Sequence, residues 1–67
     1  MKIKITSEYI TLGQFLKFCS IISSGAMAKT YLVENIVYVN NEVESRRGRK
    51  LYPGAVVKVE GKEYTIE

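Results

Sequence analysis

The chain has 67 residues, of which 46% are hydrophobic and 25% charged, a composition that indicates one folded domain rather than a disordered tail. Ten Lys and Arg residues against seven acidic residues give a net charge of +3, which favours an anionic partner. Histidine is absent and Cys19 is the single cysteine, so we expect no catalytic residues, no metal site, no cofactor and no small-molecule substrate. We therefore expect a protein that is not an enzyme.

The apolar runs are only a few residues long, and the start of the chain is interrupted by lysines. These features predict neither a membrane-spanning helix nor a secretory signal. A lone cysteine in so small a chain suits a reducing compartment. We expect residues 1–67 to form a single cytoplasmic domain that is a monomer and makes no membrane contact.

The first predicted elements are a short strand and a helix. Residues 2–6 alternate lysine with isoleucine, the period of a half-buried strand. Thr11 predicts a helix N-cap, and Gln14 completes a capping box three residues later. The apolar face of this helix has residues at helical spacing, Leu12, Phe15, Leu16 and Cys19. We expect Cys19 to be buried and inert.

A second helix is predicted after a connector. Residues 20–25 break the helical period with serines and a glycine, so the chain turns back there. Ser23 or Ser24 would cap a helix that runs from Gly25 to about Asn35, with Asn35 in the left-handed C-terminal position. The residues expected to face the first helix, or to let it approach closely, are Gly25, Ala26, Ala28, Tyr31 and Leu32.

Residues 37–50 start as a strand and end as a charge cluster. Val37 and Val39 alternate with Tyr38, and the following Asn40-Asn41 pair predicts a hairpin turn. Residues 46–50 hold four of the ten basic residues, so the rest of the chain, with six basic and seven acidic groups, sums to −1. Positive charge concentrated beside a rigid turn favours a polyanion, with nucleic acid the commonest candidate. A solvated basic loop without a partner is the alternative.

The last part of the chain predicts a run of short strands. Pro53-Gly54 suits the middle of a type II turn, and a strand from Val56 to Glu60 follows. Gly61-Lys62 is expected to turn the chain into a terminal strand that needs residues 2–6 as its neighbour. The predicted fold class is α+β, with two short antiparallel helices packed on a small, mostly antiparallel sheet of short strands.

Several motifs together resemble a known family. They are a helix, a Ser-rich turn, Ala28-Lys29, Val37-x-Val39-Asn40, an Arg-rich return and a Leu-x-Pro-Gly turn before a valine strand. This combination resembles the S-four RNA-binding domain, also called the αL motif, from about residue 11 to residue 59. It is most similar to short stand-alone bacterial members, which have a run comparable to Arg46–Leu51. The chain departs from the family pattern at Gly25, where many members have arginine, at Ala55, where an acidic residue is usual, and at Asn35 and Asn41, where glycine is usual.

The resemblance implies that structured RNA, with ribosomal RNA favoured, lies against the second helix and the hairpin return. It also implies a role in ribosome assembly or translation. Arginine suits such a partner because its planar guanidinium donates to phosphate in a bidentate fork. The candidate RNA-binding residues are Lys29, Arg46, Arg47, Arg49 and Lys50, and the candidate flanking contacts are Lys17, Ser24, Tyr38 and Asn40.

Two other interpretations remain open at this point. The first is a protein-binding adaptor that uses its basic loop on an acidic partner. The second is a β-grasp sulfur carrier, but the chain lacks the C-terminal Gly-Gly and has two helices ahead of the hairpin. Tyr38 or Tyr52 could stack on a base, although strand tyrosines are more often packing residues with a solvated hydroxyl.

Overall fold

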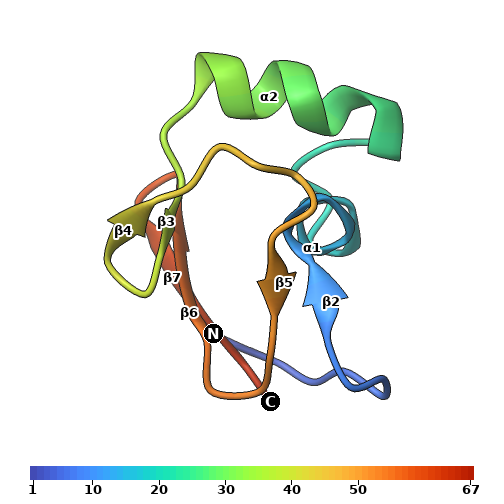
Figure 1. Ribbon diagram of the computed structural model, residues 1–67, viewed down its shortest axis with the longest axis vertical. Coiled ribbons are helices and arrows are strands. Elements are labelled where there is room, and N and C mark those ends of the chain that lie inside the picture. The colour runs from blue at the N-terminus through green and yellow to red at the C-terminus, as the bar shows by residue number, and fades with distance from the viewer.

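A computed structural model describes residues 1–67 as a set of short strands with one helix across their top end and another packed beside them (Figure 1). The elements in chain order are β1 (Lys2–Ile3), β2 (Ile10–Thr11), α1 (Leu12–Phe18), the 3-10 helix η1 (Gly25–Met27), α2 (Ala28–Glu34), β3 (Tyr38–Val39), β4 (Glu42–Val43), β5 (Lys50–Leu51), β6 (Val56–Val59) and β7 (Lys62–Ile66).

The strands form two sheets. Five of them lie in the order β1-β7-β6-β3-β4, in which only β1 and β7 are parallel. The predicted pairing of the first strand with the last is therefore confirmed, as is the α+β fold class with a mostly antiparallel sheet. The second sheet, β2 paired with β5, was not predicted, because two-residue strands show no period in the sequence.

One hydrophobic core joins the helices to the inner face of the larger sheet. Its thirteen buried residues are Leu12, Phe15, Leu16, Ile22, Ala28, Leu32, Val37, Val39, Leu51, Val57, Val59, Tyr64 and Ile66. The Phe15 ring meets the Tyr64 ring edge-on at a centroid distance of 5.3 Å, which ties α1 to β7. The predicted apolar face of α1 is thus confirmed at Leu12, Phe15 and Leu16.

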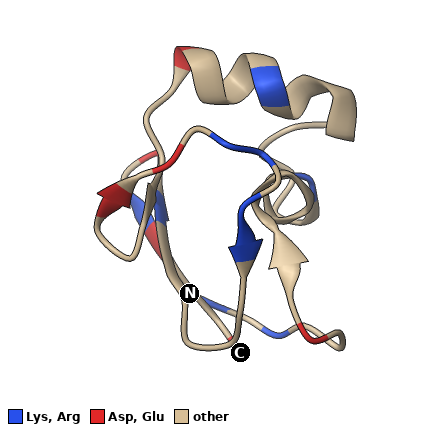
Figure 2. Cartoon of the chain, in the orientation of Figure 1, with Lys and Arg blue, Asp and Glu red and all other residues tan.

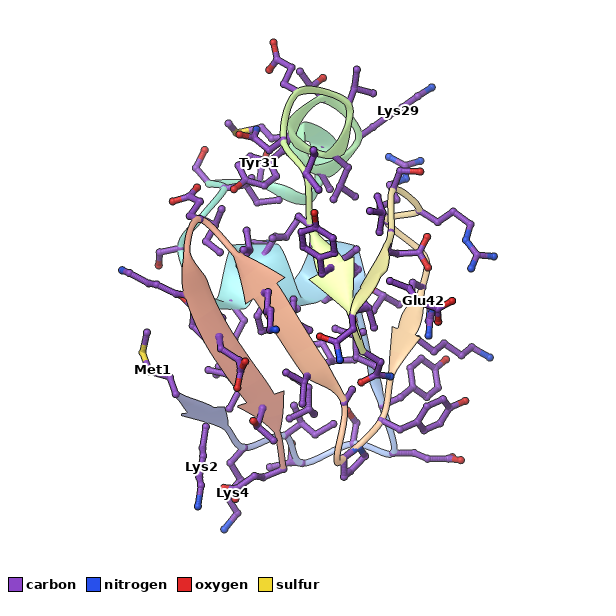
Figure 3. All side chains as sticks on the ribbon, turned by 90° about the vertical axis from the view of Figure 1, so that its left-hand side faces the viewer. Met1, Lys2, Lys4, Lys29, Tyr31 and Glu42 are labelled. Atoms are coloured by element: carbon purple, nitrogen blue, oxygen red, sulfur yellow. The ribbon has the colours of Figure 1, made fainter.

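The two helices cross steeply, so the prediction that they are antiparallel is wrong. Figure 1 shows α1 end on and α2 from the side, and the view turned by 90° in Figure 3 reverses this. The connector explains the change of direction. Ser20 takes the left-handed position after α1 (φ 60°), and the backbone N–H of Ile21 donates to the Leu16 carbonyl, as in a Schellman motif. Ile22 is then buried in the core, which fixes the path of the chain.

The ends of α2 also differ from the prediction. Asn35 is extended (φ −132°) and not left-handed, because its backbone N–H and its side-chain amide both donate to the Tyr31 carbonyl. Ser24 stands at the N-cap of η1 without a side-chain hydrogen bond. The close approach to the first helix is made by Ala28, whereas Gly25 and Ala26 are exposed.

Three smaller predictions need correction. The first strand covers Lys2–Ile3 only, rather than residues 2–6. The turn between β6 and β7 is at Glu60-Gly61, one residue earlier than predicted, with φ of 51° and 75°. Cys19 is half-buried rather than buried, and this partial burial raises the pKa of its thiol.

Candidate nucleic-acid interface

The basic segment, defined here as residues 46–50, is held by the first turn of α1. The backbone N–H groups of Leu12 and Gly13 donate to the carbonyls of Arg49 and Arg47, each at 2.8 Å. Pairing of Thr11 with Lys50 in the β2–β5 sheet adds a third attachment. The backbone of the basic segment is therefore fixed by a helix end and by a sheet, and does not hang free as a loop.

The residues at the start of α1 explain how this helix end can hold the basic segment. Thr11 Oγ1 accepts the backbone N–H of Gln14, and Gln14 Oε1 accepts that of Thr11, so the predicted capping box is confirmed. A Cβ atom on Gly13 would stand 3.4 Å from both the Arg47 carbonyl oxygen and the Ala28 Cβ. Glycine at position 13 thus lets the basic segment, α1 and α2 meet closely.

A buried carboxylate organises the arginines. The Glu44 side chain is only 7% exposed, and both of its oxygens accept hydrogen bonds. Its Oε2 accepts Arg46 Nε at 3.0 Å and the backbone N–H groups of Ser45 and Arg46, each at 3.1 Å. Its Oε1 accepts Arg46 Nη2 at 3.1 Å and Arg49 Nη1 at 2.7 Å. Two arginine side chains are therefore fixed in position by one acidic residue.

The hydrogen bonds from the Arg46 side chain are the main cause that lowers the Glu44 pKa to about 2, with Arg49 adding to the effect against the cost of burial. Glu44 is thus ionised at neutral pH. This role of Glu44 was not predicted from the sequence. The available signal was an acidic residue two positions before one arginine and five before another, a spacing that does not by itself indicate burial.

Arg47 differs from Arg46 and Arg49, because its side chain makes no ion pair or hydrogen bond within the chain. It borders a groove of about 300 Å³ that is also lined by Thr11, Gly13, Gln14, Gly25, Ala28 and Gly48. This groove brings together the start of α1, the η1–α2 segment and the basic segment. Its small residues leave the guanidinium open to a partner on this side of the molecule.

The side chain of Lys50 also makes a contact within the chain. Its Nζ lies 4.9 Å from the centre of the Tyr9 ring, a cation–π contact. The Tyr9 ring is in turn 5.7 Å from the Tyr52 ring, at an interplanar angle of 50°. A second groove of about 450 Å³ is lined by Arg46, Gly48, Arg49, Lys50 and Tyr52. Residues of the basic segment thus line two grooves, which share Gly48.

Figure 2 shows a run of positive charges on the loop before β5 and on β5 itself and another on α2, while the other basic residues are spread over the rest of the chain. In Figure 3 the exposed Lys29 side chain projects from α2 toward the side of the molecule on which β5 lies. The structure therefore brings Lys29 to the same side as the basic segment. Lys17 is exposed in the last turn of α1 and lines a different groove, with Ser7, Ile10, Gln14 and Phe18. Ser24 is exposed and precedes Gly25, which lines the Arg47 groove.

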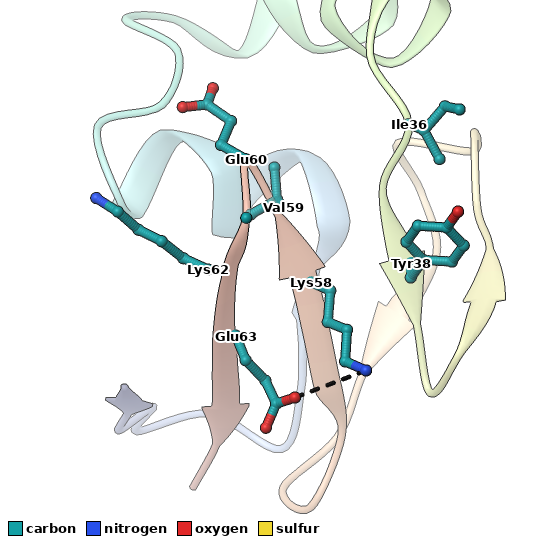
Figure 4. Close-up of a pocket in the computed structure, with 8 residues that line it drawn as sticks. Ile36, Tyr38, Lys58, Val59, Glu60, Lys62 and Glu63 are labelled. Carbon is teal, nitrogen blue, oxygen red and sulfur yellow. Dashed lines mark ion pairs between the residues drawn. The ribbon is translucent and has the colours of Figure 1, made fainter.

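The other two flanking candidates lie elsewhere. Asn40 has its Oδ1 occupied by the backbone N–H of Val56 at 3.0 Å and a left-handed backbone (φ 52°), so it serves the hairpin turn. Tyr38 lies on the outer face of the larger sheet, opposite to the buried Val37 and Val39. There it lines a shallow pocket of about 360 Å³ with Ile36 and Lys58 (Figure 4). Neither side chain is part of the grooves beside the basic segment.

No helix of the structure combines the length and the apolar character that crossing a membrane requires.

The sequence pattern of the S4 domain matches residues 3–67, which is more of the chain than residues 11–59, over which the motifs resemble this family. The chain is also 59% identical over 59 residues to a protein of Bacillus subtilis (strain 168) described as "Probable ribosome maturation protein RlbA", and the match covers 88% of this chain and 83% of the relative. This chain therefore belongs to the S4 domain family, the RNA-binding family that its motifs resemble.

Proposed function

We propose that this protein binds structured RNA, with ribosomal RNA as the favoured target, and acts as a monomer in ribosome assembly or translation. Membership of the S4 domain family supports the RNA-binding part, and the description of the Bacillus subtilis relative as a probable ribosome maturation protein supports the connection to the ribosome. The observation that carries the proposal is the set of four cations on a segment fixed by α1, β2 and Glu44.

The chemistry of these groups favours phosphate. Guanidinium groups donate in a planar fork that matches phosphate oxygens, and an A-form duplex is recognised by its shape and phosphate spacing. Glu44 fixes the orientation of Arg46 and Arg49, which lowers the entropy cost of binding. It also neutralises one of the four positive charges. Three positive charges therefore remain on the segment, one shared by Arg46 and Arg49 and the other two on Arg47 and Lys50, and Lys29 on α2 adds a fourth.

The salt dependence of binding tests whether phosphate contacts dominate. Four or five phosphate contacts predict a slope of about −3 to −4 in a plot of log affinity against log salt concentration. The measurement is a titration of the protein into a fluorescent RNA hairpin at several salt concentrations. A slope near zero would contradict a phosphate-binding surface.

A pair of charge reversals tests the location of the surface. Arg47→Glu and Lys62→Glu change the net charge equally, but Lys62 lies on β7, outside both grooves beside the basic segment. We expect Arg47→Glu to lower the affinity for RNA about 10- to 100-fold, because a charged hydrogen bond is lost, and Lys62→Glu to have little effect. Arg49 is less suitable for this test, since a glutamate there would face the buried Glu44.

Equal losses in the two variants would indicate diffuse attraction without a site. An RNA affinity unchanged by Arg47→Glu would instead favour the adaptor that binds an acidic protein. Crosslinking in cells, followed by sequencing of the attached RNA, identifies the target, and a result without enrichment of ribosomal RNA would overturn that part of the proposal.

A further inference from the structure

The groove lined by Arg46, Gly48, Arg49, Lys50 and Tyr52 combines an exposed aromatic ring with three cations. Tyr52 is 47% exposed, although a tyrosine that only packs in a small domain gains by burying its ring. No hydrogen bond within the chain involves its hydroxyl group, so this group does not explain the position of the ring. The core does not account for this side chain, and the groove beside it is open.

The backbone on both sides of Tyr52 is also held in place. Leu51 before it is buried and pairs with Ile10, while Pro53 follows it in the turn closed by the Ala55 N–H and the Tyr52 carbonyl. The tilted contact with Tyr9 covers only part of the ring. The Nζ of Lys50 lies over the Tyr9 ring, 4.9 Å from its centre. Tyr9 is thus engaged twice, and Tyr52 is the ring that remains available.

We propose that the exposed ring of Tyr52 stacks on one unpaired nucleobase of the bound RNA, while Arg46, Arg49 and Lys50 contact the phosphates next to that nucleotide. This inference rests on the proposed function and narrows it. The preferred ligand is a structured RNA with a nucleotide turned out of its stack beside the paired region. Bases in loops and bulges are accessible to aromatic side chains, whereas bases inside an A-form duplex are not.

The geometry favours this site over Tyr38 as a stacking position. Tyr38 is also partly exposed, but it lines the pocket on the outer sheet face, where Glu60 and Glu63 lie beside Lys58 and Lys62. The two carboxylates there balance the two lysines, so this pocket offers no net attraction to the phosphates of a stacked nucleotide. The Tyr52 groove contains three cations and no carboxylate among its lining residues. The charges therefore attract a nucleotide to the Tyr52 groove and not to the Tyr38 pocket.

Three RNA hairpins that differ at one position test the proposal. The first has a fully paired stem, the second has a single bulged 2-aminopurine in that stem, and the third has an abasic bulge at the same position. The two bulged RNAs carry the same number of phosphates, so their difference reports the base alone. We expect the 2-aminopurine RNA to bind about 5- to 150-fold more tightly than the abasic RNA, with quenching of its fluorescence on binding.

Variants at position 52 complete the test. Tyr52→Leu should abolish the preference for the base, so that this variant binds the 2-aminopurine and abasic RNAs equally, whereas Tyr52→Phe should keep the preference. Tyr38→Leu is the matched control and should keep it as well. Unchanged thermal melting of each variant shows that it is folded.

Equal affinity of the parent protein for the 2-aminopurine and abasic RNAs would overturn the stacking site, and so would a preference that survives in Tyr52→Leu. Both results leave RNA binding itself intact, provided that Arg47→Glu still weakens binding of all three RNAs. If none of the three RNAs binds the parent protein, the proposed function fails together with the stacking site.

Discussion

Two charged regions of this molecule differ in how their charges are balanced. The β6–β7 hairpin carries Lys58, Glu60, Lys62 and Glu63, two cations and two carboxylates. Lys58 and Glu63 pair at 3.8 Å on the outer face of the sheet (Figure 4). Residues 44–50 carry four cations and one carboxylate, an excess of three that equals the formal net charge of the whole chain.

The position of the carboxylates matters as much as their number. Glu63 is exposed, so its pair with Lys58 is weakened by water and salt. Glu44 is buried beneath the arginines and directs their side chains, with Arg46 remaining 74% exposed. In the first region charge is neutralised at the surface. In the second, one buried negative charge fixes a positive surface, which is the difference we expect between a solvated face and the binding face proposed above.

Both regions pack on the same hydrophobic core. The largest effect that we expect is the loss of stability when this core is truncated. Leu16→Ala should lower the free energy of unfolding by about 2–5 kcal/mol, because Leu16 is fully buried between the helices and the sheet. In a domain of this size that corresponds to a fall in Tm of roughly 10 °C or more. Thermal melting followed by circular dichroism measures it.

Phe18→Ala is the matched control, since Phe18 lies on the same helix but is 61% exposed. Its Tm should change little. A Leu16→Ala variant that melts within a degree or two of the parent would contradict the helix faces described above.

A change at Glu44 sharpens the comparison itself. The folded pKa of Glu44, about 2, lies below its ordinary value of 4.5, so this residue stabilises the fold above pH 4.5. That contribution is lost as the pH falls from about 4.5 toward 2. Since Arg46 lies in solvent, screening reduces its size, and we expect Glu44→Gln to cost about 1–2 kcal/mol at neutral pH.

Chemical denaturation of the parent and the variant at pH 7, 4 and 2.5 measures this effect. The difference between them should shrink as the pH falls. Glu63→Gln, which removes an exposed carboxylate, should cost less at every pH. If Glu44→Gln and Glu63→Gln behave alike, the buried carboxylate does not organise the basic segment.

Local signals in the sequence predicted the elements whose causes are local. The capping box of Thr11 and Gln14 and the left-handed turn at Asn40-Asn41 depend on neighbouring residues, and both are present in the structure. The position of the basic segment was also predictable, because charge is visible in composition. The type and position of these features can be predicted without knowing which residues far apart in the chain are in contact.

The remaining features depend on contacts between residues far apart in the chain. Pairing of β2 with β5 joins Ile10 to Leu51, and the sequence gives no period from which to infer it. Asn35 was expected in the left-handed region as a glycine substitute, but its side chain instead donates to Tyr31. Burial of Glu44 likewise depends on the path of residues 44–50 across the core. Such outcomes follow from tertiary packing, which overrides local preference.

The smallest expected effect compares the turns of the two hairpins. Both have two central residues with positive φ, Asn40-Asn41 in one and Glu60-Gly61 in the other. Asn-Gly is the preferred pair for such turns, because glycine adopts positive φ without steric cost. Asn41→Gly should therefore raise the stability by about 0.5 kcal/mol, or a few degrees in Tm. It removes a 3.2 Å hydrogen bond from Lys58, which keeps its pairing with Glu63.

The matched control for this prediction is the same substitution one residue earlier. Asn40 also has a positive φ, but its Oδ1 accepts the Val56 backbone N–H at 3.0 Å. Asn40→Gly relieves the same steric cost and leaves that donor without its partner, so it should lower the stability by about 1 kcal/mol. Opposite signs at adjacent positions would separate backbone preference from side-chain bonding in this hairpin. A loss of stability in Asn41→Gly as large as in Asn40→Gly would show that the Asn41–Lys58 bond, and not the backbone angle, governs position 41.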